Sequence, residues 1–131
     1  MMKPIVSTLL FFTVFSNVFF AGPIDKIAAL LQQGQAHELA KQFAASMEFS
    51  ILDDEKDVSK AQAETLLTNF FTQNKPVSVK VIHRIETNPS LQYAVVQLRT
   101  SNGNFRVSYS LKITNGNQEI TDLHIEAEKG Q

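Results

Sequence analysis

Three side chains of the sequence could place acid–base chemistry inside a fold: His83, Tyr93 and Tyr109. Each lies in a run where polar and apolar residues alternate, which is the pattern of a half-buried strand. A neutral imidazole can accept a proton near pH 7, and a tyrosine hydroxyl can donate a hydrogen bond. We therefore take all three as candidate ligand-pocket residues and His83 as the candidate catalytic base, against the plainer interpretation of a buried structural histidine.

Acidic residues between 53 and 64 invite a calcium hypothesis. Asp53, Glu55, Asp57 and Glu64 match positions one, three, five and twelve of an EF-hand loop. Val58 stands where that loop requires glycine, so the match fails at its most specific position. We expect no metal site.

The remaining motifs also argue against a cofactor. His37, His83 and His124 are expected on a helix, on the apolar face of a strand and on the polar face of a strand. They should not converge on one ion. The chain has no cysteine, no phosphate-binding loop and no nucleophile elbow, so we expect no cofactor.

Four strand-like runs in the second half of the chain must position these side chains. They are rich in β-branched and aromatic residues and are separated by short turn signals, two of which contain Asn-Gly. The connections are too short for parallel crossovers, so we expect an antiparallel meander. The runs are residues 77–86, 91–100, 104–113 and 118–126.

Alternation along these runs predicts which face is buried. In the first run, five residues share the face expected to point inward: Val77, Val79, Val81, His83 and Ile85. The second run has apolar residues on both faces, which a β-bulge or a second, partly buried face would explain. The outward face is expected to be less polar than solvent exposure requires, and we take five of its residues as a candidate interface: Ile82, Arg84, Val96, Leu98 and Arg106.

Three amphipathic helices are expected before the meander. Helical spacing of apolar residues predicts a first helix ending at Gly34 and a second running from Ala36 to Met47. A short strand near residues 47–52 and a charged turn at 53–57 should follow. Ser59 and Gln62 then form a capping box that begins the third helix.

The N-terminus has the layout of a secretory signal peptide. Lys3 precedes an apolar run over residues 5–15, and small residues follow. We assign 1–21 to the signal and 22–131 to one domain, the alternative being an uncleaved membrane anchor. The protein is expected to be exported to a bacterial periplasm or the exterior. Its net charge of −1 and pI near 6.3 give no reason to bind nucleic acid.

The predicted order of elements resembles the nuclear transport factor 2-like superfamily, also called cystatin-like α+β. The resemblance covers the whole mature chain and is diffuse rather than a single motif. It is similar to a secreted bacterial branch without an established activity, through these residues: 39–43, Phe70-Phe71, His83, Tyr93, Leu98, Thr100, 105–107 and 120–126.

This resemblance implies an α+β fold in which a curved sheet wraps three helices into a cone with an internal pocket. In ketosteroid isomerases of the superfamily, a carboxylate base lies in the cone. Ile51 or Ser50 occupies that position here, and no carboxylate is expected on the apolar face of a strand. We therefore do not expect the isomerase mechanism.

A binding module is therefore the expected function. It would hold a small apolar molecule in the cone or a protein partner on the sheet, and in this superfamily such sheet faces often pair into homodimers. The alternative is a small lyase, isomerase or hydrolase with His83 as general base.

Overall fold

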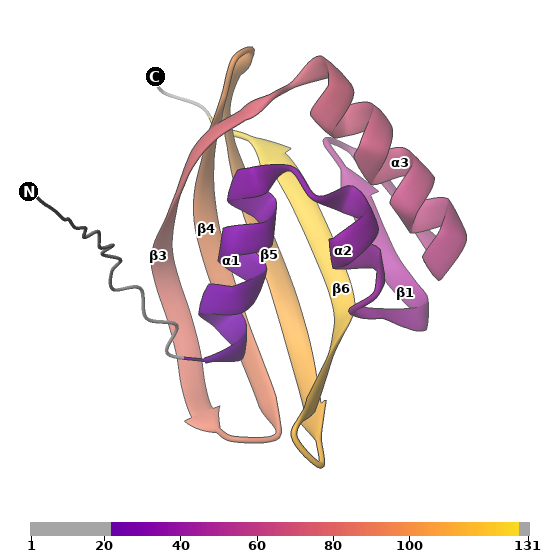
Figure 1. The fold of residues 1–131 in the computed structure, drawn as a ribbon, viewed down its shortest axis with the longest axis vertical. Helices are drawn as coiled ribbons and strands as arrows, with labels where there is room; N and C mark the ends of the chain where they lie inside the picture. The colour runs from indigo at the N-terminus through magenta and orange to yellow at the C-terminus, as the bar shows by residue number, and fades with distance from the viewer. Residues whose placement is uncertain (1–21, 129–131) are drawn as a thin grey trace, which may run out of the picture.

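The computed structural model describes residues 22–128, so the predicted signal peptide lies outside the described residues. Within that range the chain forms three helices and six strands (Figure 1). In chain order these are α1 (Pro23–Gln33), α2 (Ala36–Ala40), β1 (Phe43–Ile51), β2 (Asp54–Ser59), α3 (Lys60–Gln73), β3 (Pro76–Asn88), β4 (Leu91–Thr100), β5 (Gly103–Thr114) and β6 (Asn117–Ala127). No helix in the described range has the length and apolarity to cross a bilayer.

All six strands form one sheet in the order β2-β1-β6-β5-β4-β3. Strands β3 to β6 are the predicted antiparallel meander, and β1 adds to β6 in parallel while β2 pairs with β1 as a hairpin. The three helices lie together against one face of the curved sheet (Figure 1). We call this the inner face and the uncovered one the outer face. The predicted α+β class is confirmed.

The first helix forms as the sequence predicts. Ile24, Ile27 and Leu31 recur at helical spacing and are fully buried. Gly34 ends the helix with a φ of 66°, in the left-handed region that glycine enters without a steric penalty. A Cβ there would lie 3.3 Å from the Pro76 ring, so two constraints favour glycine at this position.

The second helix is shorter than predicted. It ends at Ala40, and the chain is already a strand at Phe43, whereas helical spacing continues to Met47. The Ile120 N–H donates to the Gln42 carbonyl over 2.7 Å, which ties the start of β1 to β6. Pairing with β6 decides the structure of this segment, because tertiary contacts override a local helix propensity.

The third helix begins with the predicted capping box. The Gln62 N–H donates to Ser59 Oγ over 3.2 Å, and the Ser59 N–H donates to Gln62 Oε1 over 3.0 Å. The charged residues before it are not a turn. They form β2, which pairs with β1 along its length. The strand has one buried residue, Val58, and five exposed ones.

Two hairpins follow the expected turn chemistry. Asn115 and Gly116 have φ angles of 52° and 82°, so both central residues of the β5–β6 turn are left-handed, as a type I′ turn requires. At the β3–β4 turn, the Ser90 N–H donates to Asn88 Oδ1 over 2.9 Å. Short, well-formed turns hold the meander in register.

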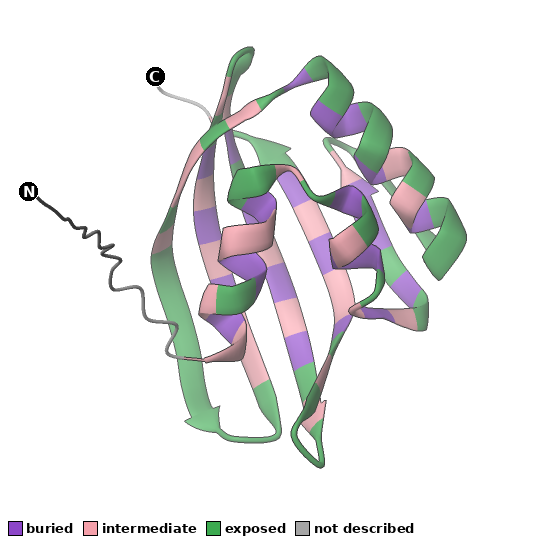
Figure 2. Ribbon diagram, viewed as in Figure 1, coloured by how far each residue is buried: buried purple, intermediate pink, exposed green. Residues whose placement is uncertain are grey.

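The core fills the space between the helices and the inner face. Figure 2 shows buried residues on the helices where they face the sheet, and at alternating positions along the central strands. The large side chains that are essentially inaccessible include Ile24, Ile27, Leu31, Leu39, Phe43, Phe49, Leu67, Leu98, Tyr109, Leu111, Ile120 and Leu123.

Candidate functional site

The outer face of β3 and β4 carries a group of four side chains that we call the outer patch. His83 lies opposite Val95, and Ile85 lies opposite Tyr93, and residues directly opposite each other on antiparallel strands share a face. Tyr93 and Val95 are half-buried, while His83 is exposed and Ile85 is 45% exposed. The helices lie on the other side of the sheet (Figure 1).

The predicted inward orientation of His83 is therefore wrong. The cause is a β-bulge in β3, where the register shifts between Val81 and His83. Val81 faces inward opposite the fully buried Val96. One extra residue then reverses the alternation, so His83 points outward and the next residue, Arg84, lies opposite the buried Ala94 on the inner face.

Arg84, predicted as an interface residue, instead ties β3 to α1. Its guanidinium donates to both carboxylate oxygens of Asp25, over 2.8 and 3.1 Å, and to Glu86 over 3.3 Å. The hydrogen bonds to Asp25 raise the pKa of Arg84 above its ordinary value. The pair is bidentate and only partly exposed, which is the geometry in which an ion pair contributes most.

Tyr109 is on the opposite face from Tyr93. It is fully buried, and its hydroxyl donates to the Ile24 carbonyl at the start of α1 over 2.9 Å. Burial raises the pKa of this phenol. His83, Tyr93 and Tyr109 therefore do not come together, and none of them lines the main hollows on residues 22–128, which measure about 370 to 570 Å³.

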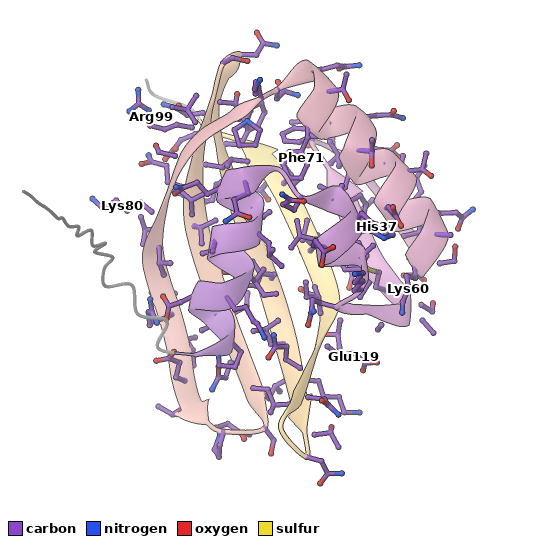
Figure 3. The ribbon with its side chains drawn as sticks, in the orientation of Figure 1. His37, Lys60, Phe71, Lys80, Arg99 and Glu119 are labelled. Atoms are coloured by element: carbon purple, nitrogen blue, oxygen red, sulfur yellow. The ribbon has the colours of Figure 1, made fainter. Side chains whose placement is uncertain are left out.

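Two further residues of the predicted interface do not lie on the outer face. Val96 and Leu98 are fully buried on the inner face. The side chains of β4 that were expected to point outward therefore point inward. Ile82 is 42% exposed, at the bulge. Arg106 is exposed and lies opposite Gln97 and Glu126 on the outer face. Figure 3 shows other cations of this side, Lys80 and Arg99, extending away from the body of the molecule.

A Ser-His-Asp arrangement that sequence analysis missed lies on the outer face of β1 and β6. Ser50 Oγ and His124 Nδ1 are 2.8 Å apart, and His124 Nε2 is 3.9 Å from an oxygen of Asp122. The parallel pairing of β1 with β6 brings these residues together, and no local pattern indicates that pairing. Because β1 is paired on both sides, its N–H groups are committed to the sheet and offer no oxyanion hole. The arrangement is a polar contact and not a catalytic triad.

Carboxylates gather beside this contact. The neighbouring carboxyl group of Glu55 raises the pKa of Glu48, through side-chain hydrogen bonding and through repulsion between the two charges. Of the four residues of the EF-hand hypothesis, Glu55 and Asp57 lie on β2, an extended strand rather than a loop, while Asp53 precedes β2 and Glu64 is on α3. Among residues 22–128 no group of three or more histidine, aspartate or glutamate side chains could hold a metal ion. His37 lies on α2 (Figure 3), and its Nδ1 is 2.9 Å from a carboxylate oxygen of Glu64 on α3.

This chain has a nuclear transport factor 2-like, or cystatin-like, fold, with its helices on one face of a curved mixed sheet. A solved nuclear transport factor 2-like protein from Cytophaga hutchinsonii is similar, with 15% identity and a TM-score of 0.59 over 80% of this chain and 92% of that one. Within this class the chain belongs to the family described as Domain of unknown function (DUF4783), whose profile matches residues 24–126.

Two solved members of that family are more similar. The protein from Bacteroides uniformis has 23% identity and a TM-score of 0.74 over 79% of this chain and 95% of that one. The protein from Bacteroides ovatus has 25% identity and a TM-score of 0.73 over 79% and 94%. No curated protein matches the chain.

Proposed function

We propose that this chain is an exported binding module that engages a protein partner, a second copy of itself, across the outer face of its sheet. The observation that carries the proposal is the outer patch: His83, Ile85, Tyr93 and Val95 are contiguous, and the helices leave them uncovered. A two-fold symmetry axis that passes through the outer patch would place the patch of one copy against the same patch of the other copy. Such an isologous contact buries apolar surface from both partners.

The other binding and catalytic hypotheses have less support. A small apolar ligand inside the cone needs open volume there, and the inner-face side chains are packed against the helices. A lyase, isomerase or hydrolase with His83 as general base needs that ring in a sheltered cavity, yet His83 is exposed on an open sheet surface. Export itself is proposed from the N-terminal sequence alone, and intact-mass measurement of the protein recovered outside the cytoplasm tests it.

Sedimentation equilibrium over a range of concentrations tests the contact. We expect a dimer for the domain and a monomer for Val95→Glu, because the substitution puts a charge in the centre of the patch. Ser46→Glu is the matched control, since Ser46 is exposed on β1, outside the patch. A wild-type monomer at every concentration would overturn the proposal, and so would equal dissociation of both variants.

A further inference from the structure

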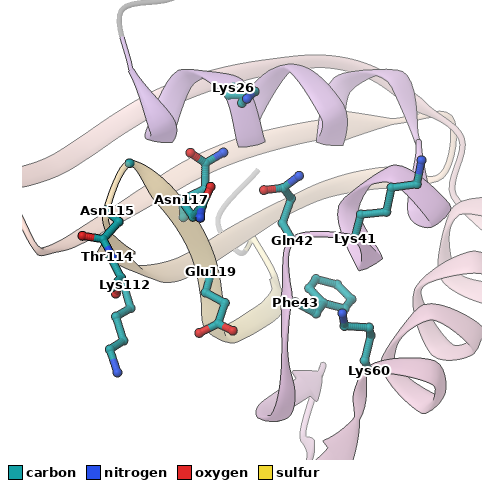
Figure 4. A pocket seen from close by; sticks show the side chains of 12 residues that line it. Lys26, Lys41, Gln42, Phe43, Lys60, Lys112, Thr114, Asn115, Asn117 and Glu119 are labelled. Carbon is teal, nitrogen blue, oxygen red and sulfur yellow. The ribbon is translucent and has the colours of Figure 1, made fainter.

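A hollow of about 570 Å³ lies beside the β5–β6 hairpin, at the start of β1 (Figure 4). It is separate from the outer patch and shares no residue with it. Four lysines from four parts of the chain line it: Lys26 of α1, Lys41 between α2 and β1, Lys60 of α3 and Lys112 of β5.

The charges of the hollow are unbalanced. Glu119 is the one carboxylate among its lining residues, against the four lysines. Lys41 pairs with Glu38 over 3.2 Å. Lys26, Lys60 and Lys112 form no ion pair with any residue of the described range 22–128. Lys112 lies opposite Glu119 in the β5–β6 ladder, and Figure 4 shows its side chain directed away from Lys26 and Lys60, so the ammonium groups surround the rim of the hollow. An excess of positive charge around the rim raises the potential of the hollow and favours an anion in it.

Neutral polar groups complete the lining. They are Gln42, Thr114, Asn115, Asn117 and Gln118. Figure 4 shows Gln42 on the chain that enters β1, and Thr114, Asn115 and Asn117 on the β5–β6 hairpin, on two sides of the hollow. Amides and hydroxyls of this kind recognise the hydroxyl groups of a polar ligand.

The walls of the hollow are held in place without a ligand. On one side, the left-handed Asn115-Gly116 turn closes a hairpin whose strands pair without interruption from Thr114–Asn117 to Leu111–Ile120. The Ile120 N–H donates to the Gln42 carbonyl over 2.7 Å and joins that hairpin to the other side. A preformed site loses little conformational entropy when a ligand binds.

We propose that this hollow binds a small organic anion that carries at least two negative charges and several hydroxyl groups, with sugar phosphates as the model class. The volume fits small-molecule sites, which measure roughly 300 to 1,000 Å³. The lysines neutralise the phosphoryl group, and the amides bind the hydroxyl groups. Nothing in this proposal depends on the contact across the outer patch.

Titration of the ¹⁵N-labelled domain tests the site with three probes: glucose 6-phosphate, pyrophosphate and glucose. We expect glucose 6-phosphate to shift the amide signals of Asn115, Gly116 and Asn117, and glucose to leave them unchanged. Pyrophosphate distinguishes the two parts of the ligand. Binding as tight as that of the sugar phosphate would show that charge alone is recognised, and would overturn the sugar-hydroxyl part of the proposal.

Two lysine substitutions test the location. The variant Lys60→Gln, Lys112→Gln should bind glucose 6-phosphate at least roughly tenfold more weakly, because it lacks two positive charges that attract the phosphoryl group. Both side chains are exposed, so the fold should be retained. Lys75→Gln is the control, since Lys75 is exposed but lines a different hollow. Equal weakening in the control, or no shift of the hairpin signals with any phosphate, would overturn the site.

Discussion

The inner and outer faces of the sheet are made by alternate residues of the same strands, yet their polar groups are treated differently. On the inner face Tyr109 has the Ile24 carbonyl as its partner and Arg84 has Asp25, whereas Gln92 Oε1 is buried there without a partner among the described residues. On the outer face two acids, Glu48 and Glu55, are neighbours, and the second raises the pKa of the first. The inner face is arranged for stability, and the outer face keeps groups that folding alone does not require.

Adjacent valines of β4 test this difference most directly. Val96 is fully buried on the inner face and Val95 is half-buried on the outer face. Val96→Ala should lower the free energy of unfolding by about 2 to 3 kcal/mol, since two buried methyl groups are lost and a cavity remains. Val95→Ala has the same change in strand propensity and should cost less than about 1 kcal/mol. Urea denaturation at low protein concentration measures both, and equal costs would show that the outer face is covered.

Removal of a single hydroxyl tests the satisfied polar groups of the inner face. Tyr109→Phe keeps the ring but leaves the Ile24 carbonyl without its donor. We expect a loss of about 1 to 2 kcal/mol, because a buried acceptor loses its partner. Thermal unfolding monitored by circular dichroism measures the loss. An unchanged melting temperature would mean that water replaces the hydroxyl and that this part of the inner face is open.

The smallest expected effect concerns Glu48 on the outer face. Its pKa is raised in the folded state, so the folded protein keeps this proton at a pH where the unfolded chain has already lost it. Between the two pKa values, stability therefore falls as pH rises, and above the raised pKa the loss is complete. Glu48→Gln removes the repulsion from Glu55, so the variant should be the more stable protein at neutral pH and should equal the wild type in acid. Melting temperatures across that range would contradict this if the difference did not depend on pH.

Local signals in the sequence predicted much of this fold. The capping box at Ser59, the glycine stop at Gly34 and the Asn-Gly turn at 115–116 act over a few residues, and all three form as expected. Helical spacing predicts a helix as far as Met47, which covers the first half of β1. The strand forms because β1 pairs with β6, whose residues are more than 70 positions away in the sequence. Local spacing contains no information about such a partner.

The candidate site was harder to predict than the fold, because strand faces depend on counting. The bulge after Val81 adds one residue, so the side chains from His83 to Ile85 change their face, until a second register shift before Asn88. For this reason His83 lies on the outer face and Arg84 on the inner face, the reverse of the prediction. The lysine-lined hollow was missed for a different reason: Lys26, Lys60 and Lys112 lie on separate elements that meet only in the folded chain.

The order of the strands has a further consequence for how copies of this domain can aggregate. Its two edges are β2, whose residues are mostly charged, and β3, which has three register irregularities and carries Lys80. Charges and bulges at sheet edges prevent another strand from adding to the open hydrogen-bonding groups. Growth into edge-to-edge fibres is therefore disfavoured at both ends of the sheet.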